Sequence, residues 1–287
     1  MLRILTASLA FVATFALAEE APMGNRVTVN GMEMYYEVSG SGTPLIVLHG
    51  AHMNIVSMGQ IIPKLAETHK VYALELQAHG RTTDIERPIT YEALADDVAA
   101  FMGAVGIEKA DVFGYSMGGV AGLQLAVRHP EKVAHLALAS IAFDSNGWQP
   151  ALKALKETMN VEMFMALPMA KTYQTLAADP NGYPALVKKL IDLEHEKFAW
   201  EELVRTIKAP VLVISGDADV ASLDHTLELF RLLGGGVMGD MGEPLPTARL
   251  AILPASSHTA VIGQVDLLLE LIEPFLSDET PDSALFP

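Results

Sequence analysis

The chain has 287 residues, of which 51% are hydrophobic and 19% are charged, and it contains no cysteine. This composition excludes a disordered or collagen-like chain and predicts one large or two modest folded domains. The missing cysteines exclude disulfides, thiolate metal ligands and a cysteine nucleophile. The formal net charge of −16 repels polyanions, so nucleic acid and anionic membrane surfaces are not expected as partners.

The N-terminal segment has the pattern of a secretory signal peptide. Met1–Arg3 supply a positive charge, residues 4–15 are mostly apolar, and Ala16-Leu17-Ala18 has the small-x-small pattern that signal peptidase cleaves. An uncleaved membrane helix is the alternative, but the apolar run is shorter than the roughly 20 residues that span a bilayer. We therefore predict that residues 1–18 are removed on export, that the protein is periplasmic or secreted, and that it keeps no stable membrane anchor.

Segments of strand length alternate with helical patterns along the rest of the chain. Apolar and polar residues alternate on both sides of Asn30-Gly31, a dipeptide typical of a two-residue hairpin turn. Leu94, Val98 and Phe101 lie on one face of a predicted helix. Continuous apolar runs, typical of strands buried in a parallel sheet, occupy residues 44–48, 71–76, 110–113, 133–139, 211–214 and 250–253. This order predicts an α/β fold with a mostly parallel sheet flanked by helices.

One long interval has no strand pattern and contains helix-like pieces separated by prolines. We predict that residues 141–208 form a helical lid (cap) inserted into a core of residues 19–140 and 209–287. Such a lid would cover the carboxyl edge of the sheet, where α/β proteins bind ligands. Residues 234–246 are rich in glycine and are predicted to form a surface loop.

The segment Gly114-Tyr115-Ser116-Met117-Gly118 matches the G-x-S-x-G nucleophile elbow, in which a serine occupies a sharp turn between a strand and a helix. An apolar strand precedes the motif and a helical pattern follows it, which is the setting that the motif requires. Glycine is needed on both sides of the serine because neighbouring backbone passes close to such a turn. Ser116 is therefore the predicted nucleophile, although an ordinary turn with an incidental serine is the alternative.

Together with further segments, this motif resembles the α/β-hydrolase family, and in particular bacterial esterase-like serine hydrolases. Leu45-Ile46-Val47-Leu48-His49-Gly50 is similar to the family's strand-to-loop segment that ends in HG. Gln77-Ala78-His79-Gly80-Arg81-Thr82 is similar to the family's GHGRS turn. The resemblance extends from about Val27 to Leu276. It implies an α/β-hydrolase fold and an oxyanion hole formed by the backbone amides of Ala51 and Met117.

A serine hydroxyl needs a base to take its proton and a carboxylate to orient that base. Of the nine histidines, His258 follows the last predicted strand, where the family places its base, and it completes the chain order Ser, Asp, His. The family's G-x-x-D pattern selects Asp219 as the acid. Asp144, after the preceding strand, is where some family members carry their acid, and Asp224 is also near, so both remain alternatives.

The other histidines are expected to have structural roles, with one exception. His49 should hold the oxyanion loop by a hydrogen bond, and His79 should stabilise its turn. Asp217 should likewise make local turn hydrogen bonds. His52 lies just past the oxyanion loop and could face a substrate. A solvated or core position is expected for His69, His129, His135, His195 and His225.

The substrate pocket is predicted to involve His52, Tyr115 and Met163. Methionine is flexible and adapts to irregular ligands, although a methionine stripe is more often plain core. If the apolar lid residues line the pocket, an ester with an apolar acyl group is expected. A substrate carboxylate would require Arg81 or a lid lysine as its partner. The apolar lid residues in question are Met159, Met163, Phe164, Met165, Leu167 and Met169.

These features predict a serine hydrolase that cleaves a small or medium carboxylic ester or lactone (EC 3.1.1 class) through an acyl-enzyme on Ser116. Neither a metal nor an organic cofactor is expected. The resemblance also disfavours epoxide hydrolysis and dehalogenation, for which the family uses a carboxylate at the elbow. The alternatives are carbon–carbon bond hydrolysis, acyl transfer or perhydrolysis by the same residues, or a non-catalytic binding protein on this fold. A small-molecule ester is the expected partner, and the oligomeric state is left open.

Overall fold

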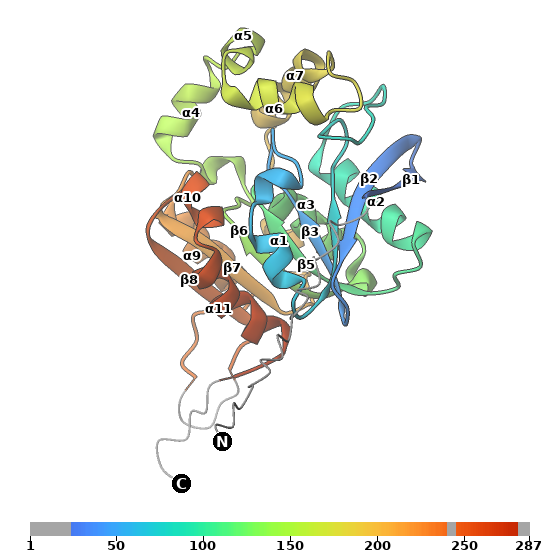
Figure 1. Ribbon diagram of the computed structural model, residues 1–287. Helices are drawn as coiled ribbons and strands as arrows, with labels where there is room; N and C mark the ends of the chain where they lie inside the picture. The colour runs from blue at the N-terminus through green and yellow to red at the C-terminus, as the bar shows by residue number, and fades with distance from the viewer. Residues whose placement is uncertain (1–23, 240–244, 281–287) are drawn as a thin grey trace, which may run out of the picture.

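The computed structural model describes residues 24–239 and 245–280, so the predicted signal peptide, residues 1–18, lies outside the described residues. Its strands are β1 (Gly24–Val29), β2 (Met32–Ser39), β3 (Pro44–Leu48), β4 (Lys70–Leu74), β5 (Ala110–Tyr115), β6 (Val133–Ala139), β7 (Val211–Ala218) and β8 (Ala248–Ser257). They form one eight-stranded sheet in the order β1-β2-β4-β3-β5-β6-β7-β8 (Figure 1). The pairs β1·β2 and β2·β4 are antiparallel, and the pairs from β4 through β8 are parallel. The predicted mostly parallel sheet is confirmed.

The strands β7 and β8 are longer than the apolar runs that predicted them. The runs cover residues 211–214 and 250–253, but the pairing continues beyond a register shift until Ala218 meets Ser257. Backbone ladder bonds need no apolar side chain, so hydropathy alone ends these strands too early. The extension places Asp219 and His258 directly after the ends of two neighbouring strands.

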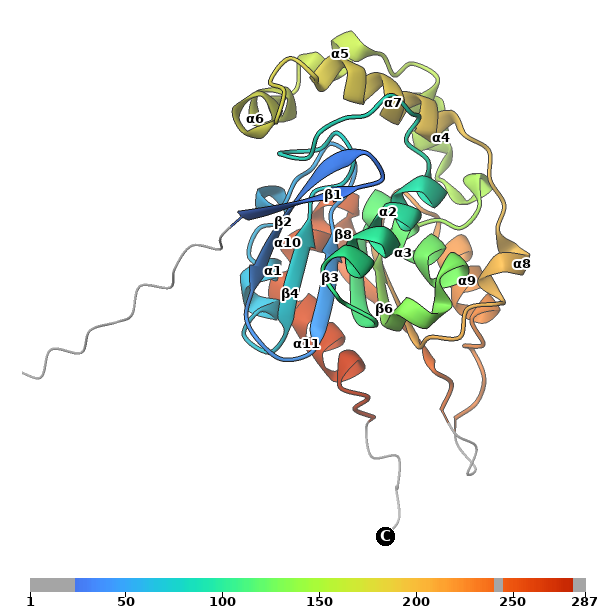
Figure 2. The ribbon, with the colours of Figure 1, turned by 90° about the vertical axis from the view of Figure 1, so that its right-hand side faces the viewer.

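Helices cover both faces of the sheet, as Figure 2 shows from the side. Successive side chains of a strand point to opposite faces. Ile46 and Leu48 of β3 therefore enter one buried core, and Leu45 and Val47 enter the other. Residues of α2, α3 and α9 complete the first core, and residues of α1 and α11 complete the second. The helices outside the long insertion are η1 (Val56–Met58), α1 (Ile61–Leu65), α2 (Tyr91–Ala104), α3 (Met117–Arg128), η2 (Pro130–Lys132), α9 (Leu223–Leu232), α10 (His258–Gly263) and α11 (Val265–Leu276).

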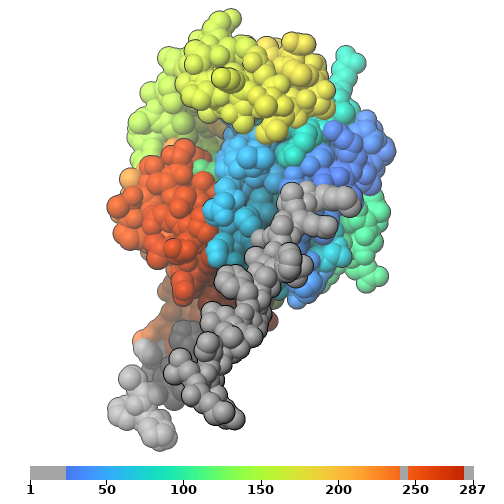
Figure 3. Space-filling model, in the orientation of Figure 1, coloured from blue at the N-terminus to red at the C-terminus, as the bar shows by residue number. Residues whose placement is uncertain are grey.

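The connection from β6 to β7 contains helices but no strand of the sheet. It holds η3 (Ser145–Gly147), α4 (Pro150–Lys156), α5 (Val161–Met165), α6 (Pro168–Leu176), α7 (Tyr183–His195) and α8 (Glu201–Val204). Helices α4–α7, which we call the cap, lie together beyond one edge of the sheet (Figures 1 and 2). In the space-filling view they form a continuous layer above the core (Figure 3). Helix α8 lies outside this layer and contacts α3 and α9.

Contacts between the cap and the core identify which edge of the sheet the cap covers. Lys189 of α7 forms an ion pair with Asp84 at 2.7 Å, and the amide of Ala178 donates to the carbonyl oxygen of Gly80 at 3.2 Å. Both core partners lie in the loop that follows the carboxyl end of β4. The cap therefore stands over the carboxyl edge of the parallel strands, where α/β folds bind their ligands.

The described residues contain no helix that is long and apolar enough to cross a bilayer. The described parts of residues 234–246 carry no helix or strand. Val237 and Met238 in this segment are 62% and 68% exposed, in agreement with the predicted surface loop.

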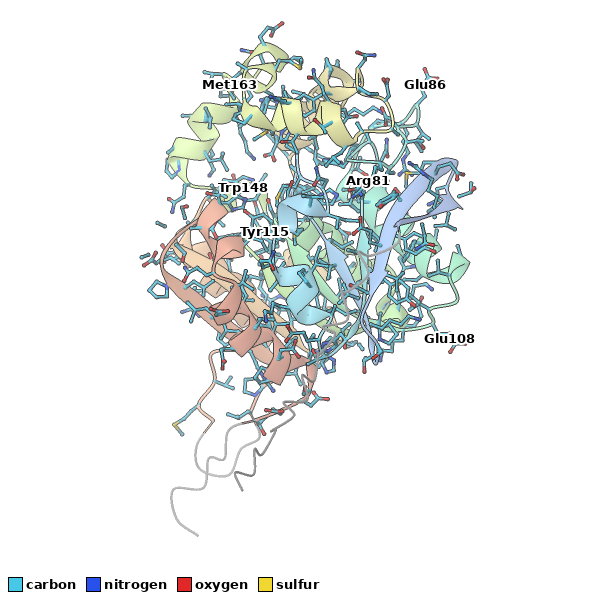
Figure 4. All side chains as sticks on the ribbon, in the orientation of Figure 1. Arg81, Glu86, Glu108, Tyr115, Trp148 and Met163 are labelled. Atoms are coloured by element: carbon cyan, nitrogen blue, oxygen red, sulfur yellow. The ribbon has the colours of Figure 1, made fainter. Side chains whose placement is uncertain are left out.

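A buried ion pair holds the loop after β4. The carboxylate of Glu75 is fully buried, and Arg81 binds it with its guanidinium at 2.5 Å and with its backbone amide. Arg81 also pairs with Glu37 at 3.0 Å, and its guanidinium lies over the Tyr35 ring (Figure 4). Ile55, close behind the predicted oxyanion loop, donates its amide to the same Glu75 carboxylate at 3.4 Å. Arg81 is thus occupied by glutamates rather than free to meet a substrate carboxylate.

Replacing Arg81 by alanine should lower the free energy of unfolding by about 3–5 kcal/mol, because it leaves the Glu75 charge buried without its partner. Urea denaturation measures this change. The matched control is Lys64→Ala, whose pair with Glu67 is exposed at both ends (46% and 63%) and should contribute less than about 1 kcal/mol. Equal losses in the two variants would contradict the structural role of Arg81.

Candidate active site

The turn between β5 and α3 is strained at Ser116. This residue has φ 53° and ψ −124°, a backbone conformation that residues other than glycine rarely adopt. Its amide donates to the carbonyl oxygen of Ala139 at 2.9 Å, which ties the turn to the end of β6. The serine therefore occupies the sharp strand-to-helix turn that the G-x-S-x-G motif predicts.

Two glycines permit this turn because backbone passes close to them. A Cβ atom built on Gly118 would lie 2.5 Å from the carbonyl oxygens of His49 and Leu48, and one built on Gly114 would lie 2.6 Å from the Cα atom of Gly119. Real Cβ atoms do not approach other heavy atoms so closely. Gly118 is thus required by packing against the end of β3, and Gly114 by packing against the start of α3.

Ser116, His258 and Asp219 form a continuous hydrogen-bonded chain. The Nε2 atom of His258 lies 3.0 Å from Ser116 Oγ, and its Nδ1 atom lies 2.8 Å from Asp219 Oδ1. His258 is the first residue of α10 and Asp219 directly follows β7, so parallel strands bring three distant segments to one edge of the sheet. Since an ionised carboxylate only accepts hydrogen bonds, Nδ1 of His258 carries the proton and Nε2 presents its lone pair to the serine hydroxyl.

The carboxylate of Asp219 is fully buried, with no exposed side-chain area. Burial by itself raises its pKa, but hydrogen bonds from His258 and Ser140 more than offset this effect and keep the pKa below its ordinary value. The backbone amides of Gly216 and Val220 donate to the same carboxylate at 3.1 and 2.7 Å. Asp219 therefore stays ionised without contact with water.

The other carboxylates that the sequence offered do not contact His258. Asp144 is the N-cap of η3 and accepts from the amide of Asn146 at 2.6 Å. Asp217 accepts from the amides of Ala255 and Ser256 at 2.8 and 3.0 Å, and Asp224 lies in the first turn of α9. The structure thus brings Asp219 to the imidazole, while Asp217 holds the loop that precedes His258.

The segment after β3 is held by a buried histidine. His49 donates from Nδ1 to the carbonyl oxygen of Gly50 at 2.8 Å and accepts at Nε2 from the amide of Leu76 at 3.1 Å. Burial lowers the pKa of His49, so it is the neutral form that makes both bonds. Ala51 follows directly. Met117 is the first residue of α3, and the amides of a first helical turn have no partner within the helix.

His52 lies between this segment and the cap. Its ring stacks on Phe164 of α5 at a centroid distance of 4.4 Å, and its Nδ1 atom lies 3.3 Å from the hydroxyl of the buried Tyr183 of α7. Burial lowers the pKa of His52 to about 4, so the ring is neutral near pH 7. Met163 precedes Phe164 in α5 and is half-buried (Figure 4).

Tyr115, which the sequence predicts to line the substrate pocket, is buried next to His258. Its side chain is 2% exposed, its hydroxyl donates to the carbonyl oxygen of His258 at 2.8 Å, and its ring lies 5.2 Å from the His258 ring. Its side chain belongs to the core that α1 and α11 complete. The hydroxyl of Tyr115 thus helps to hold the backbone of His258 in place.

Sequence reasoning missed Ser140, whose buried hydroxyl donates to Asp219 Oδ2 at 2.6 Å. No motif marks this residue, and only the pairing of β6 with β7 could have placed it beside the acid. In residues 24–239 and 245–280, no group of three or more histidine or carboxylate side chains is arranged to hold a metal ion.

Known proteins resemble this chain in sequence and in structure. The family model for the alpha/beta hydrolase fold matches residues 43–177. A putative carbamate hydrolase of Azorhizobium caulinodans is 25% identical over 272 residues, which cover 86% of this chain and 96% of that protein. The pimeloyl-[acyl-carrier protein] methyl ester esterase of Aliivibrio salmonicida is 25% identical over 273 residues, which cover 86% and 97%.

Among solved structures, that of Est816, an N-acyl homoserine lactone degrading enzyme, superposes with a TM-score of 0.70 at 23% identity and covers 88% of this chain and 100% of that one. This likeness shows the fold. The chain has the α/β-hydrolase fold. It is a hydrolase.

Gly118→Ala should destabilise the protein by about 1–3 kcal/mol, because the added methyl group meets fixed backbone at the end of β3. The matched control is Gly122→Ala in the same helix, where the nearest atom is a leucine methyl group at 3.3 Å that can move aside. Thermal unfolding of the two variants checks the difference. A Gly118 variant as stable as the Gly122 variant would show that the elbow is not tightly packed.

Proposed function

We propose that the protein is a serine hydrolase that cleaves a small or medium carboxylic ester or lactone through an acyl-enzyme on Ser116. The observation that carries the proposal is the chain of two hydrogen bonds, 3.0 and 2.8 Å long, that joins Ser116 Oγ to His258 and His258 to the buried Asp219. A serine hydroxyl becomes a nucleophile when an oriented neutral imidazole accepts its proton, and this arrangement supplies both the base and its orientation.

In the first half-reaction Ser116 Oγ attacks the ester carbonyl carbon while His258 Nε2 takes the hydroxyl proton. The negative charge that develops on the carbonyl oxygen is stabilised by the amides of Ala51 and Met117 and by the N-terminal end of α3. His258 then gives the proton to the departing alkoxide, the ester bond breaks, and the acyl group remains on Ser116.

In the second half-reaction His258 takes a proton from water, and the resulting hydroxide attacks the acyl carbon. The bond to Ser116 Oγ breaks, the proton returns to the serine, and a carboxylic acid is released. Throughout the cycle Asp219 holds the imidazole in one tautomer and stabilises the imidazolium. The steps require side chains, backbone amides and water.

Two features support an acyl–oxygen bond as the target. Two relatives that match 86% of the chain are a methyl ester esterase and a putative carbamate hydrolase, and both names describe cleavage beside a carbonyl group. The cap side chains that contact His52 are Phe164 and Tyr183, which carry no charge, and the guanidinium of Arg81 is held by Glu37 and Glu75. We therefore propose a neutral ester or lactone with an apolar acyl group, and a lid role for the cap.

Ser116→Ala should reduce hydrolysis of short-chain p-nitrophenyl esters by at least about 10³-fold, because the nucleophile is removed while the fold is kept. A fluorophosphonate should form one adduct on Ser116 of the unchanged protein, detected by mass spectrometry, and none on the variant. Equal rates in the two proteins would refute the nucleophile. A panel of esters, lactones and vinylogous diketones then separates ester cleavage from carbon–carbon bond hydrolysis.

Replacing each carboxylate in turn should distinguish Asp219, which the sequence selects as the acid, from Asp144, which it leaves as an alternative. Asp219→Asn should lower kcat by on the order of 10⁴-fold, because an amide in place of the carboxylate favours the wrong imidazole tautomer. Asp144→Asn, at a residue that caps η3, should change kcat by less than about 3-fold. Steady-state kinetics of both variants is the measurement, and a loss confined to the Asp144 variant would reverse the assignment.

A further inference from the structure

The two oxygens of the Asp219 carboxylate are bound by different groups. Oδ1 faces His258 at 2.8 Å and also accepts from the amide of Val220. Oδ2 accepts from the hydroxyl of Ser140 at 2.6 Å and from the amide of Gly216 at 3.1 Å, while the hydroxyl of Ser215 lies farther away at 3.4 Å. The Ser140 bond is therefore the shortest contact of the oxygen that points away from the imidazole.

Ser140 has a backbone conformation that residues other than glycine rarely adopt. It follows β6 with φ 60° and is completely buried, and the left-handed region at this φ favours glycine. Its amide donates to the carbonyl oxygen of Ile214 in β7 at 2.8 Å. A glycine would relieve the backbone strain but would leave Oδ2 of Asp219 without its shortest hydrogen bond.

The end of β6 also holds the nucleophile. The carbonyl oxygen of Ala139 accepts a hydrogen bond from the amide of Ser116 at 2.9 Å. The next residue is Ser140, whose hydroxyl donates to Asp219. Ala139, the last residue of β6, and Ser140, the residue after it, therefore fix the nucleophile and the acid relative to each other. Figure 1 shows β6 between β5, which leads to Ser116, and β7, which leads to Asp219.

We propose that Ser140 is a positioning residue for the reaction: its hydroxyl holds the Asp219 carboxylate in the ionised state and aims its other oxygen at His258. This inference rests on the proposed function of the triad. Ser140 touches neither the substrate nor the reacting atoms and acts through Asp219.

The direction of the pH effect follows from the groups that face Asp219. The titratable side chains are His258, which is hydrogen bonded to it, and Tyr115 of β5, whose pKa is raised by burial and by the Asp219 charge. The serines do not titrate in the working range. Removing the Ser140 hydroxyl removes a donor that favours the ionised carboxylate, so the pKa of Asp219 rises.

The less stabilised carboxylate also attracts the proton of a charged His258 more strongly. Both changes favour protonated forms of the pair, whereas attack by Ser116 needs an ionised Asp219 and a neutral His258. The acid limb of the pH–rate profile must therefore move to higher pH.

The test uses Ser140→Ala and Ser140→Gly, with Ser215→Ala as the matched control at the same carboxylate oxygen. The rate of Ser116 labelling by a fluorophosphonate is followed from pH 4 to pH 9, which requires no knowledge of the natural substrate. The alanine variant keeps the backbone strain and the glycine variant relieves it, so the two differ in stability but share the missing hydroxyl.

We expect the midpoint of the acid limb to rise by about one pH unit in both Ser140 variants, with about a tenfold slower labelling on that limb. The Ser215 variant should move it by less than half as much, because its hydroxyl lies nearer to the carbonyl oxygen of Gly216, at 3.3 Å, than to Asp219. An unshifted limb in a folded Ser140→Gly variant would overturn the inference. If the fluorophosphonate does not label the protein without any substitution, the proposed function itself is refuted.

Discussion

The arrangement of this site depends on keeping one negative charge ionised inside the protein. A carboxylate removed from water costs several kcal/mol unless donors replace the lost hydration. The donors to Asp219 come from three places: His258 of α10, the backbone of the β7 turn, and Ser140 after β6. Each donor is held by the sheet, so the pairing of neighbouring strands sets the geometry of the acid and, through it, that of the imidazole.

Backbone strain gathers at the same edge of the sheet. Of the seven non-glycine residues that have positive φ in the described part of the chain, five are His52, Ala78, Ser116, Ser140 and Ala255. Four of these five lie in loops that follow strands, and Ala255 lies in the segment that leads to His258. Strained conformations persist where surrounding contacts determine them, and here those contacts are close backbone packing around Gly118 and Gly114 and hydrogen bonds between strand ends. At Ser116 and Ser140 the sheet thus maintains strained backbone, and the hydroxyl groups of these serines meet His258 and Asp219.

The cap meets the core through contacts of two kinds. Lys189 and Asp84 form an ion pair on the rim, while Phe164 and Tyr183 surround the neutral ring of His52 beside the oxyanion segment. The cap therefore contacts the segment after β3 at His52, one residue after Ala51.

The sequence alone determined the sheet, the insertion after β6 and the elbow at Ser116, because apolar runs, helical periodicity and glycine spacing are local properties of the chain. It selected Asp219 as the acid and His258 as the base but left Asp144 as an alternative, and it gave no sign that the Tyr115 side chain is buried beside His258. Those outcomes depend on which strand ends lie side by side and on which face each side chain points to. The role of Ser140 could be seen only in the tertiary structure, for the same reason. No sequence motif marks this serine, and its hydroxyl reaches Asp219 only because β6 pairs with β7.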